Sequence, residues 1–108
     1  MQMGGLATIG TRRPANFRHI IINNGAHDSV GGQPTVALKI DIQGIARGAG
    51  YRAVHLAQTK AELERILSLK EEGPVLIEVR TRKGSRKDLG RPKESPVENK
   101  TALMEFMK

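Results

Sequence analysis

The chain has 108 residues, a formal net charge of +7 at pH 7 and only 3% aromatic residues. This length suits one small domain and not two. The absence of cysteine excludes disulfides, thiolate metal sites and cysteine nucleophiles. No apolar run approaches the ~20 residues of a membrane span, and no apolar segment follows a charged start as in a signal peptide. We therefore expect a cytoplasmic protein that does not bind membranes.

The first third of the sequence predicts a helix, a strand and a long loop. One helical face combines small and apolar residues at the spacing i, i+3, i+4 and i+7, namely Met3, Leu6, Ala7 and Gly10. Pro14 ends this helix, because the residue before a proline disfavours helical backbone. The apolar run from Phe17 to Ile22 predicts a strand that is buried on both faces of a parallel sheet. A polar, glycine-rich loop follows from Asn23 to Thr35.

The middle of the sequence alternates between strand and helix patterns. Residues 36–40 are mildly apolar and predicted to be extended, and Asp41 is a good N-cap for a helix that stops at Gly50. The next strand covers 51–56. The capping box Thr59–Glu62 opens a helix predicted to end at Gly73, and Val75–Val79 forms a third strand. This order predicts an α/β fold with three layers, in which crossover helices cover a parallel sheet.

The last 29 residues differ in character from the rest. Residues 80–96 form a basic loop with a single acid before Lys93, and residues 97–107 form a terminal helix behind a serine cap. We treat residues 1–108 as a single domain. Three interpretations of the basic loop stay open: a solvated charged surface, a nucleic-acid contact, or a contact to an anionic substrate. Nucleic acid is disfavoured because the few aromatic residues are not interleaved with the arginines.

The loop after the first strand carries the most specific chemical signal. In open α/β sheets, ligands bind beyond the carboxyl ends of the strands, and Asn23 and Asn24 lie at such an end. The Asn24 side chain and the backbone carbonyls of a glycine-rich loop suit Mg²⁺, which binds oxygen ligands. A plain Asn/Gly turn explains the same residues. His27 could move protons beside a ligand, or could be an ordinary loop histidine.

The run from Asn23 to Thr35 closely resembles the thiamine-diphosphate-binding domain of phosphonopyruvate decarboxylases, and the β subunit of sulfopyruvate decarboxylases is similar. The resemblance implies a thiamine-diphosphate- and Mg²⁺-dependent lyase that converts phosphonopyruvate or sulfopyruvate to the aldehyde and CO₂. It assigns Mg²⁺ to the Asn24 side chain and the Ala26 carbonyl. The cofactor would be bound by Asn24, Gly25, Ala26 and His27, with His27 as a candidate catalytic residue. An anionic substrate group would lie near Arg80, Arg82 or Arg86.

The sequence departs from the family pattern because the Gly-Asp-Gly that opens the cofactor motif is absent. We therefore expect a partial thiamine-diphosphate-binding fold that lacks its first strand and is inactive alone. The implied partner is a pyrimidine-binding domain or subunit, in a homo- or hetero-oligomer. The isolated chain should bind the cofactor weakly and self-associate; tight binding would mean that Asp28 or Asp41 supplies the missing acid. The alternative function is a non-catalytic basic module that binds nucleic acid or an acidic partner.

Overall fold

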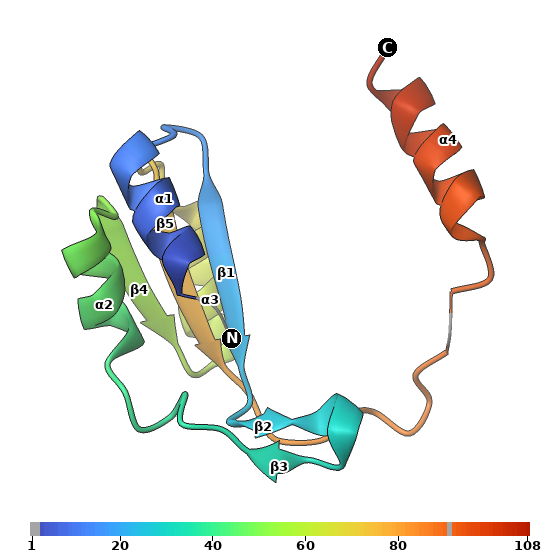
Figure 1. Cartoon of the computed structure of the whole chain (residues 1–108), viewed down its shortest axis with the longest axis horizontal. Helices are drawn as coiled ribbons and strands as arrows, with labels where there is room; N and C mark the ends of the chain where they lie inside the picture. The colour runs from blue at the N-terminus through green and yellow to red at the C-terminus, as the bar shows by residue number, and fades with distance from the viewer. Residues whose placement is uncertain (1–2, 91) are drawn as a thin grey trace.

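The computed structural model describes residues 3–90 and 92–108, which form a small parallel sheet with helices on both faces (Figure 1). The sheet has the order β1-β5-β4, from β1 (Arg18–Asn23), β4 (Ala53–Ala57) and β5 (Val75–Arg80). Both pairs are parallel: Ile20 of β1 and His55 of β4 are each aligned with Ile77 of β5. The predicted α/β class with a parallel sheet is confirmed.

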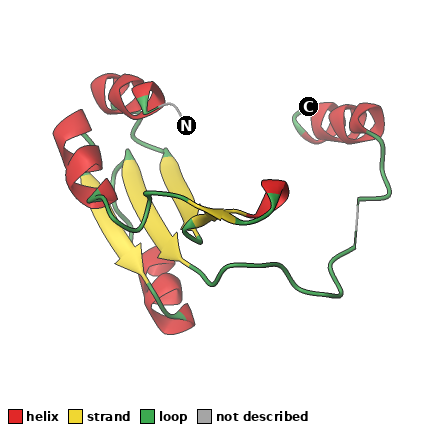
Figure 2. Ribbon diagram, turned by 60° about the horizontal axis from the view of Figure 1, so that its bottom comes forward, coloured by secondary structure: helices red, strands yellow, loops and turns green. Residues whose placement is uncertain are grey.

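Helices cover the two faces of the sheet in separate layers (Figure 2). The connection from β1 to β4 passes through α2 (Ile42–Ala49), and the connection from β4 back to β5 passes through α3 (Lys60–Ser68). Because these two crossovers run in opposite directions across the sheet, right-handed connections place their helices on opposite faces. The first helix, α1 (Gly4–Arg12), packs beside α2.

Two apolar clusters hold the layers together, and the central strand β5 contributes to both. On the face of α1 and α2, Leu76 packs with Ile42, Ala46 and Tyr51. On the face of α3, Val75 and Ile77 pack with Ala57 and Ile66. The strand is buried on both faces because it lies in the middle of the sheet.

The starts of α2 and α3 follow the predicted caps. The Asp41 carboxylate accepts a hydrogen bond from the Gly44 N–H at 2.8 Å, and Thr59 and Glu62 form the predicted capping box. The prediction that α3 continues to Gly73 is wrong. The helix ends at Ser68 because Leu69 is extended, and the Leu69 carbonyl accepts a hydrogen bond from the Arg18 guanidinium at 2.6 Å.

The prediction that the first strand is buried on both faces is also wrong. Ile21 packs against the cluster beneath α1 and α2, but Ile20 and Ile22 are 46% and 63% exposed. They face the side of the sheet that carries α3, but the apolar cluster beneath α3 is formed with residues of β4 and β5. The strand β1 is thus an edge strand with one open face.

The loop after β1 is more ordered than a sequence of turn residues suggests. It contains the short antiparallel pair β2 (Ala26–His27) and β3 (Gln33–Pro34), joined through the 3₁₀ turn η1 (Asp28–Val30). Residues 36–40, predicted to be extended, instead form a turn in which the Lys39 N–H donates to the Val36 carbonyl at 2.8 Å.

The helix α4 (Pro96–Phe106) stands apart from the sheet at the end of an extended segment (Figures 1 and 2). Ser95 and Glu98 form its capping box, and none of its residues is buried. Among the described residues, no helix is long and apolar enough to cross a membrane. The division of the chain into a single domain, a basic loop and a terminal helix stays a prediction.

Candidate functional site

The candidate site lies at the carboxyl ends of β1 and β5, where the loops that follow both strands run together. Asn23 ends β1 opposite Arg80 of β5, and the Thr81 N–H continues the pairing by donating to the Asn23 carbonyl at 3.0 Å. The predicted glycine-rich loop and the predicted basic segment therefore leave the sheet side by side. This position is the one at which open α/β sheets bind ligands.

A buried carboxylate fixes the start of the glycine-rich loop. Glu78 is 1% exposed and lies on the face of the sheet covered by α2. Its oxygens accept hydrogen bonds from Asn23 Nδ2 at 2.7 Å, from Gln43 Nε2, and from Arg80 Nε at 3.2 Å. The donors come from β1, α2 and β5, so one side chain ties three elements together beneath the loop. Asn23 is also buried, and its Oδ1 accepts a hydrogen bond from the Gly25 N–H at 3.1 Å.

The neighbouring asparagine, Asn24, is held by the loop itself. Its Oδ1 accepts a hydrogen bond from the Ala26 N–H at 3.1 Å, and its Nδ2 donates to Asp28 Oδ2 at 2.6 Å. Gly25 between them has φ +67°, which residues with a side chain rarely adopt. The Asn24 amide is therefore bound at both ends, and its oxygen keeps one free lone pair.

The Asn24 oxygen and the Ala26 carbonyl fit two ligand positions of a hard cation. The carbonyls of Gly25 and His27 accept hydrogen bonds from Thr35 and Gly32 across the β2–β3 pair, so the Ala26 carbonyl between them points away from β3. Within the described residues, no group of three or more histidines and acids is arranged to hold a metal. These two neutral oxygens suit Mg²⁺ that arrives with phosphate oxygens, since such sites use few protein ligands.

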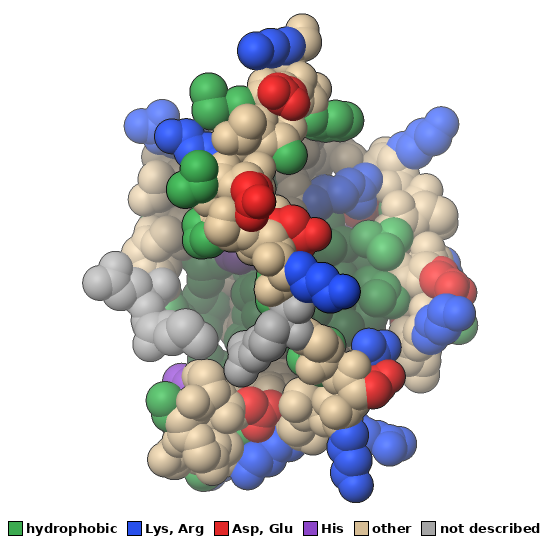
Figure 3. Space-filling model, turned by 90° about the vertical axis from the view of Figure 1, so that its right-hand side faces the viewer, with side chains coloured by type: hydrophobic (Ala, Val, Ile, Leu, Met, Phe, Trp, Pro, Cys, Tyr) green, Lys and Arg blue, Asp and Glu red, His purple; other side chains and the backbone are tan. Residues whose placement is uncertain are grey.

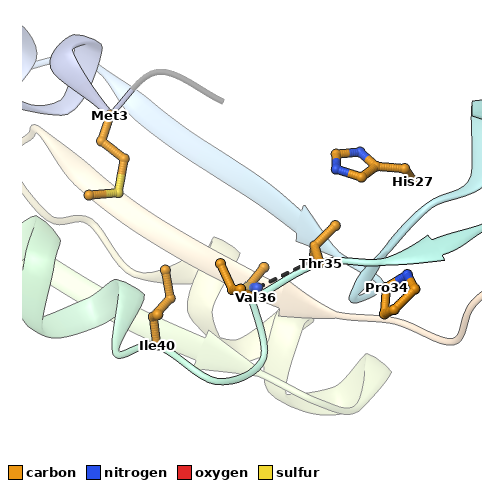
Figure 4. Close-up of a pocket in the computed structure, with 7 residues that line it drawn as sticks. Met3, His27, Pro34, Thr35, Val36 and Ile40 are labelled. Atoms are coloured by element: carbon orange, nitrogen blue, oxygen red, sulfur yellow. Dashed lines mark hydrogen bonds between the residues drawn. The ribbon is translucent and has the colours of Figure 1, made fainter.

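An apolar cavity of about 440 Å³ opens beside the same loop (Figure 4). His27 lies at one side of it and Met3 and Ile40 at the other, with Thr35 and Val36 between them. His27 is exposed, so its ring is accessible to a ligand in this cavity. The walls are mainly apolar, which suits an uncharged ring system better than a phosphate.

The three arginines assigned to an anionic substrate occupy different environments. Arg80 is bound through its Nε to the buried Glu78, which leaves its terminal nitrogens available on a side chain that is 34% exposed. Arg82 is exposed. Arg86 is paired with Asp88 at 3.3 Å and lines a second cavity of about 350 Å³, together with Asp28, Ser29, Ser85, Leu89 and Gly90. Their role in substrate binding stays a prediction.

Sequence reasoning missed the part played by Glu78 and Gln43. The signal was present for Glu78, because an acid inside the apolar strand 75–79 has to find buried donors. Its partners could not be named, since Asn23 lies 55 positions away and Gln43 lies 35 positions away.

Comparison with known proteins agrees with the resemblance drawn from the Asn23–Thr35 run. No protein-family model matches the sequence. The chain is 42% identical over 100 residues to phosphonopyruvate decarboxylase of Streptomyces viridochromogenes, a match that covers 91% of this chain and 25% of that protein. Phosphonopyruvate decarboxylase of Streptomyces hygroscopicus is also 42% identical, over 98% of this chain and 27% of its own length.

A more distant match widens the group of relatives. Sulfopyruvate decarboxylase subunit beta of Methanothermobacter thermautotrophicus is 28% identical over 79% of this chain, and the match covers 44% of that subunit. The chain thus spans about a quarter of the phosphonopyruvate decarboxylases that it matches and less than half of the sulfopyruvate decarboxylase subunit. Over nearly its whole length, this chain is a homologue of one part of the phosphonopyruvate decarboxylases.

Proposed function

We propose that this chain forms the diphosphate-binding side of a thiamine-diphosphate- and Mg²⁺-dependent decarboxylase that acts on phosphonopyruvate or sulfopyruvate. The products are the corresponding aldehyde and CO₂. The observation that carries the proposal is the Asn24–Ala26 turn at the carboxyl end of β1, with its two oxygens available to a cation. The similarity to decarboxylases over nearly the whole chain supports the same reaction class.

Each residue of the loop has a distinct part in this proposal. The Asn24 Oδ1 and the Ala26 carbonyl bind Mg²⁺, and Gly25 allows the backbone to approach the diphosphate because it carries no side chain. His27 lies at the mouth of the apolar cavity, where its ring nitrogens can donate a proton to a bound ligand or accept one from it. Thiamine diphosphate supplies the electron sink for loss of CO₂. The remaining half of the cofactor pocket comes from a partner domain or subunit.

The test of the metal site is Asn24→Ala in the complete enzyme, in which this chain is combined with the rest of the cofactor pocket. Removal of one of two protein ligands should weaken Mg²⁺-dependent binding of thiamine diphosphate about tenfold or more, measured by isothermal titration. Asn99→Ala is the matched control, because Asn99 is exposed on α4, away from the sheet. Equal cofactor affinity in the two variants would refute the assignment of Asn24 to the metal.

Substrate choice is tested separately through the basic segment. Arg82→Gln and Arg86→Gln should each raise KM for phosphonopyruvate more than for pyruvate, because a guanidinium donates two hydrogen bonds to a phosphonate that pyruvate lacks. Arg47→Gln on the exposed surface of α2 is the control. Equal changes in KM for the two substrates would show that these arginines are ordinary surface charges that do not bind the phosphonate.

The basic-module alternative finds less support in the distribution of charge. Figure 3 faces the side from which α4 projects, and its lysines and arginines are scattered among acids and apolar side chains. The single tyrosine is 5% exposed, so Tyr51 offers no platform on which a base could stack. Binding to single-stranded DNA that weakens steeply with added salt would favour this alternative instead.

A further inference from the structure

The acid that follows the cofactor loop, Asp28, contacts two parts of the candidate site at once. Its Oδ2 accepts hydrogen bonds from Asn24 Nδ2 at 2.6 Å and from the Gly84 N–H at 3.0 Å. Asn24 belongs to the loop after β1, whereas Gly84 belongs to the basic segment after β5. The contact with Gly84 joins residues that are 56 positions apart in the sequence.

The basic segment also contacts the loop through Lys83, the residue before Gly84. A Cβ built on Gly32 would lie 2.7 Å from Lys83 Cε and 3.0 Å from Lys83 Nζ, so the lysine side chain passes directly over Gly32. Asp28 Oδ1 would lie 3.7 Å from the same Cβ. Gly32 has φ +71°, a second reason why a side chain is disfavoured there. The basic segment therefore rests on the loop at two adjacent points.

This docking forms one wall of the second cavity. Asp28 and Ser29 line it from the loop, and Ser85 and Arg86 line it from the basic segment. Besides the packing of Lys83 over Gly32, the hydrogen bond of Gly84 is what holds Ser85 and Arg86 against the loop in the described residues, because Asp88, the partner of Arg86, belongs to the same exposed segment.

We infer that Asp28 is a positioning residue with two targets: it orients the Asn24 amide toward the cation, and it places the basic segment beside the substrate. The inference rests on the proposed function. With its nitrogen held by the carboxylate, the Asn24 amide cannot rotate to exchange the positions of its oxygen, which can bind a cation, and its NH₂ group, which cannot. Hydrogen-bonded partners of this kind fix the orientation of metal ligands and contribute to metal affinity. Through Gly84, the same carboxylate sets the position of Arg86.

The first experiment tests the contacts in this chain without cofactor. In Asp28→Ala, the Gly84 amide should exchange its hydrogen several times faster, and the NMR signals of the Asn24 side-chain amide should shift. The melting temperature should stay the same, because Asp28 is exposed and outside the core. Asp88→Ala is the matched control: it removes an acid of the basic segment that contacts Arg86 but not the loop. Unchanged exchange at Gly84 in Asp28→Ala would refute the inference.

The second experiment uses the complete enzyme. Asp28→Ala should raise the Mg²⁺ concentration for half-maximal cofactor binding about tenfold, as loss of a partner behind a metal ligand typically does. It should also raise KM for phosphonopyruvate but not for pyruvate. Asp28→Asn should recover part of both losses, because its amide oxygen still accepts from Asn24 and Gly84. If Asn24→Ala weakens cofactor binding and Asp28→Ala does not, the inference fails and the proposed function stands. If Asn24→Ala has no effect, the proposed function itself fails.

Discussion

Replacement of Glu78 by alanine tests whether its buried carboxylate organises the carboxyl ends of the strands. The substitution removes the hydrogen-bond acceptor shared by Asn23, Gln43 and Arg80. Breaking a buried charge pair by removing one partner costs about 3–5 kcal/mol. Arg80 is 34% exposed and can turn to water, and Asn23 keeps its hydrogen bond to the Ala37 carbonyl at 3.1 Å. We therefore expect the lower end of that range, about 3 kcal/mol.

Glu78→Gln separates the loss of charge from the loss of hydrogen bonds. The new amide oxygen can keep Asn23 and Arg80, and Gln43 can rotate its own amide to present an oxygen to the new NH₂ group. Only the charge assistance is lost, so the expected cost is about 1–2 kcal/mol.

Urea unfolding followed by circular dichroism measures these differences, provided that the slope of free energy against urea is the same in all variants. Glu94→Ala is the control, because an exposed acid outside the core should change stability by less than about 0.5 kcal/mol. The reasoning is refuted if Glu78→Ala costs no more than the control, or if glutamine at position 78 is as damaging as alanine.

Three further predictions concern packing, association and pH. Gly10→Ala should cost about 2 kcal/mol in the same unfolding assay, because its Cβ would lie 1.8 Å from the Ala49 carbonyl oxygen and would force α1 away from α2. Ile22→Lys should reduce self-association in sedimentation experiments without loss of stability, since it places a charge on an open edge strand; unaltered association would locate the contact elsewhere. Hydrogen bonds from the Ser95 hydroxyl and backbone N–H lower the pKa of Glu98. The cap of α4 should therefore be intact above the ordinary carboxyl pKa and should weaken as the pH falls below it. Circular dichroism should show this as a loss of helical signal in acid, and Glu98→Gln should show the same loss already at neutral pH.

Local signals predicted the elements whose determinants lie close together in sequence. The N-cap at Asp41, the stop at Gly50 and the box of Thr59 and Glu62 all act within four residues or fewer, and the structure has each of them. The same holds for β5, because the apolar residues from Val75 to Val79 predict a strand and the structure has one there. These features depend on contacts between residues that are close in sequence, so the sequence alone is enough to predict them.

The errors arose where distant parts of the chain decide the outcome. The apolar pattern of β1 predicts a strand, but whether Ile20 and Ile22 are covered depends on where α3 lies. The end of α3 depends on Leu69, whose carbonyl binds an arginine 51 positions away. In the candidate site, Asn24 was identified by resemblance to a family, whereas Glu78 could be identified only once β1, β5 and α2 had been brought together.

The buried carboxylate of Glu78 also bears on how the chain avoids misfolding. An apolar strand such as Val75–Val79 is tolerant of pairing errors, because a shift by one residue still presents aliphatic side chains on both faces. Glu78 removes that tolerance. A shift against β1 would turn its charge toward the apolar layer of Ala57 and Ile66 beneath α3, away from Asn23 and Gln43. The one acid in the central strand thus makes the observed alignment of the sheet far more stable than its nearest competitors, and the same alignment assembles the candidate site.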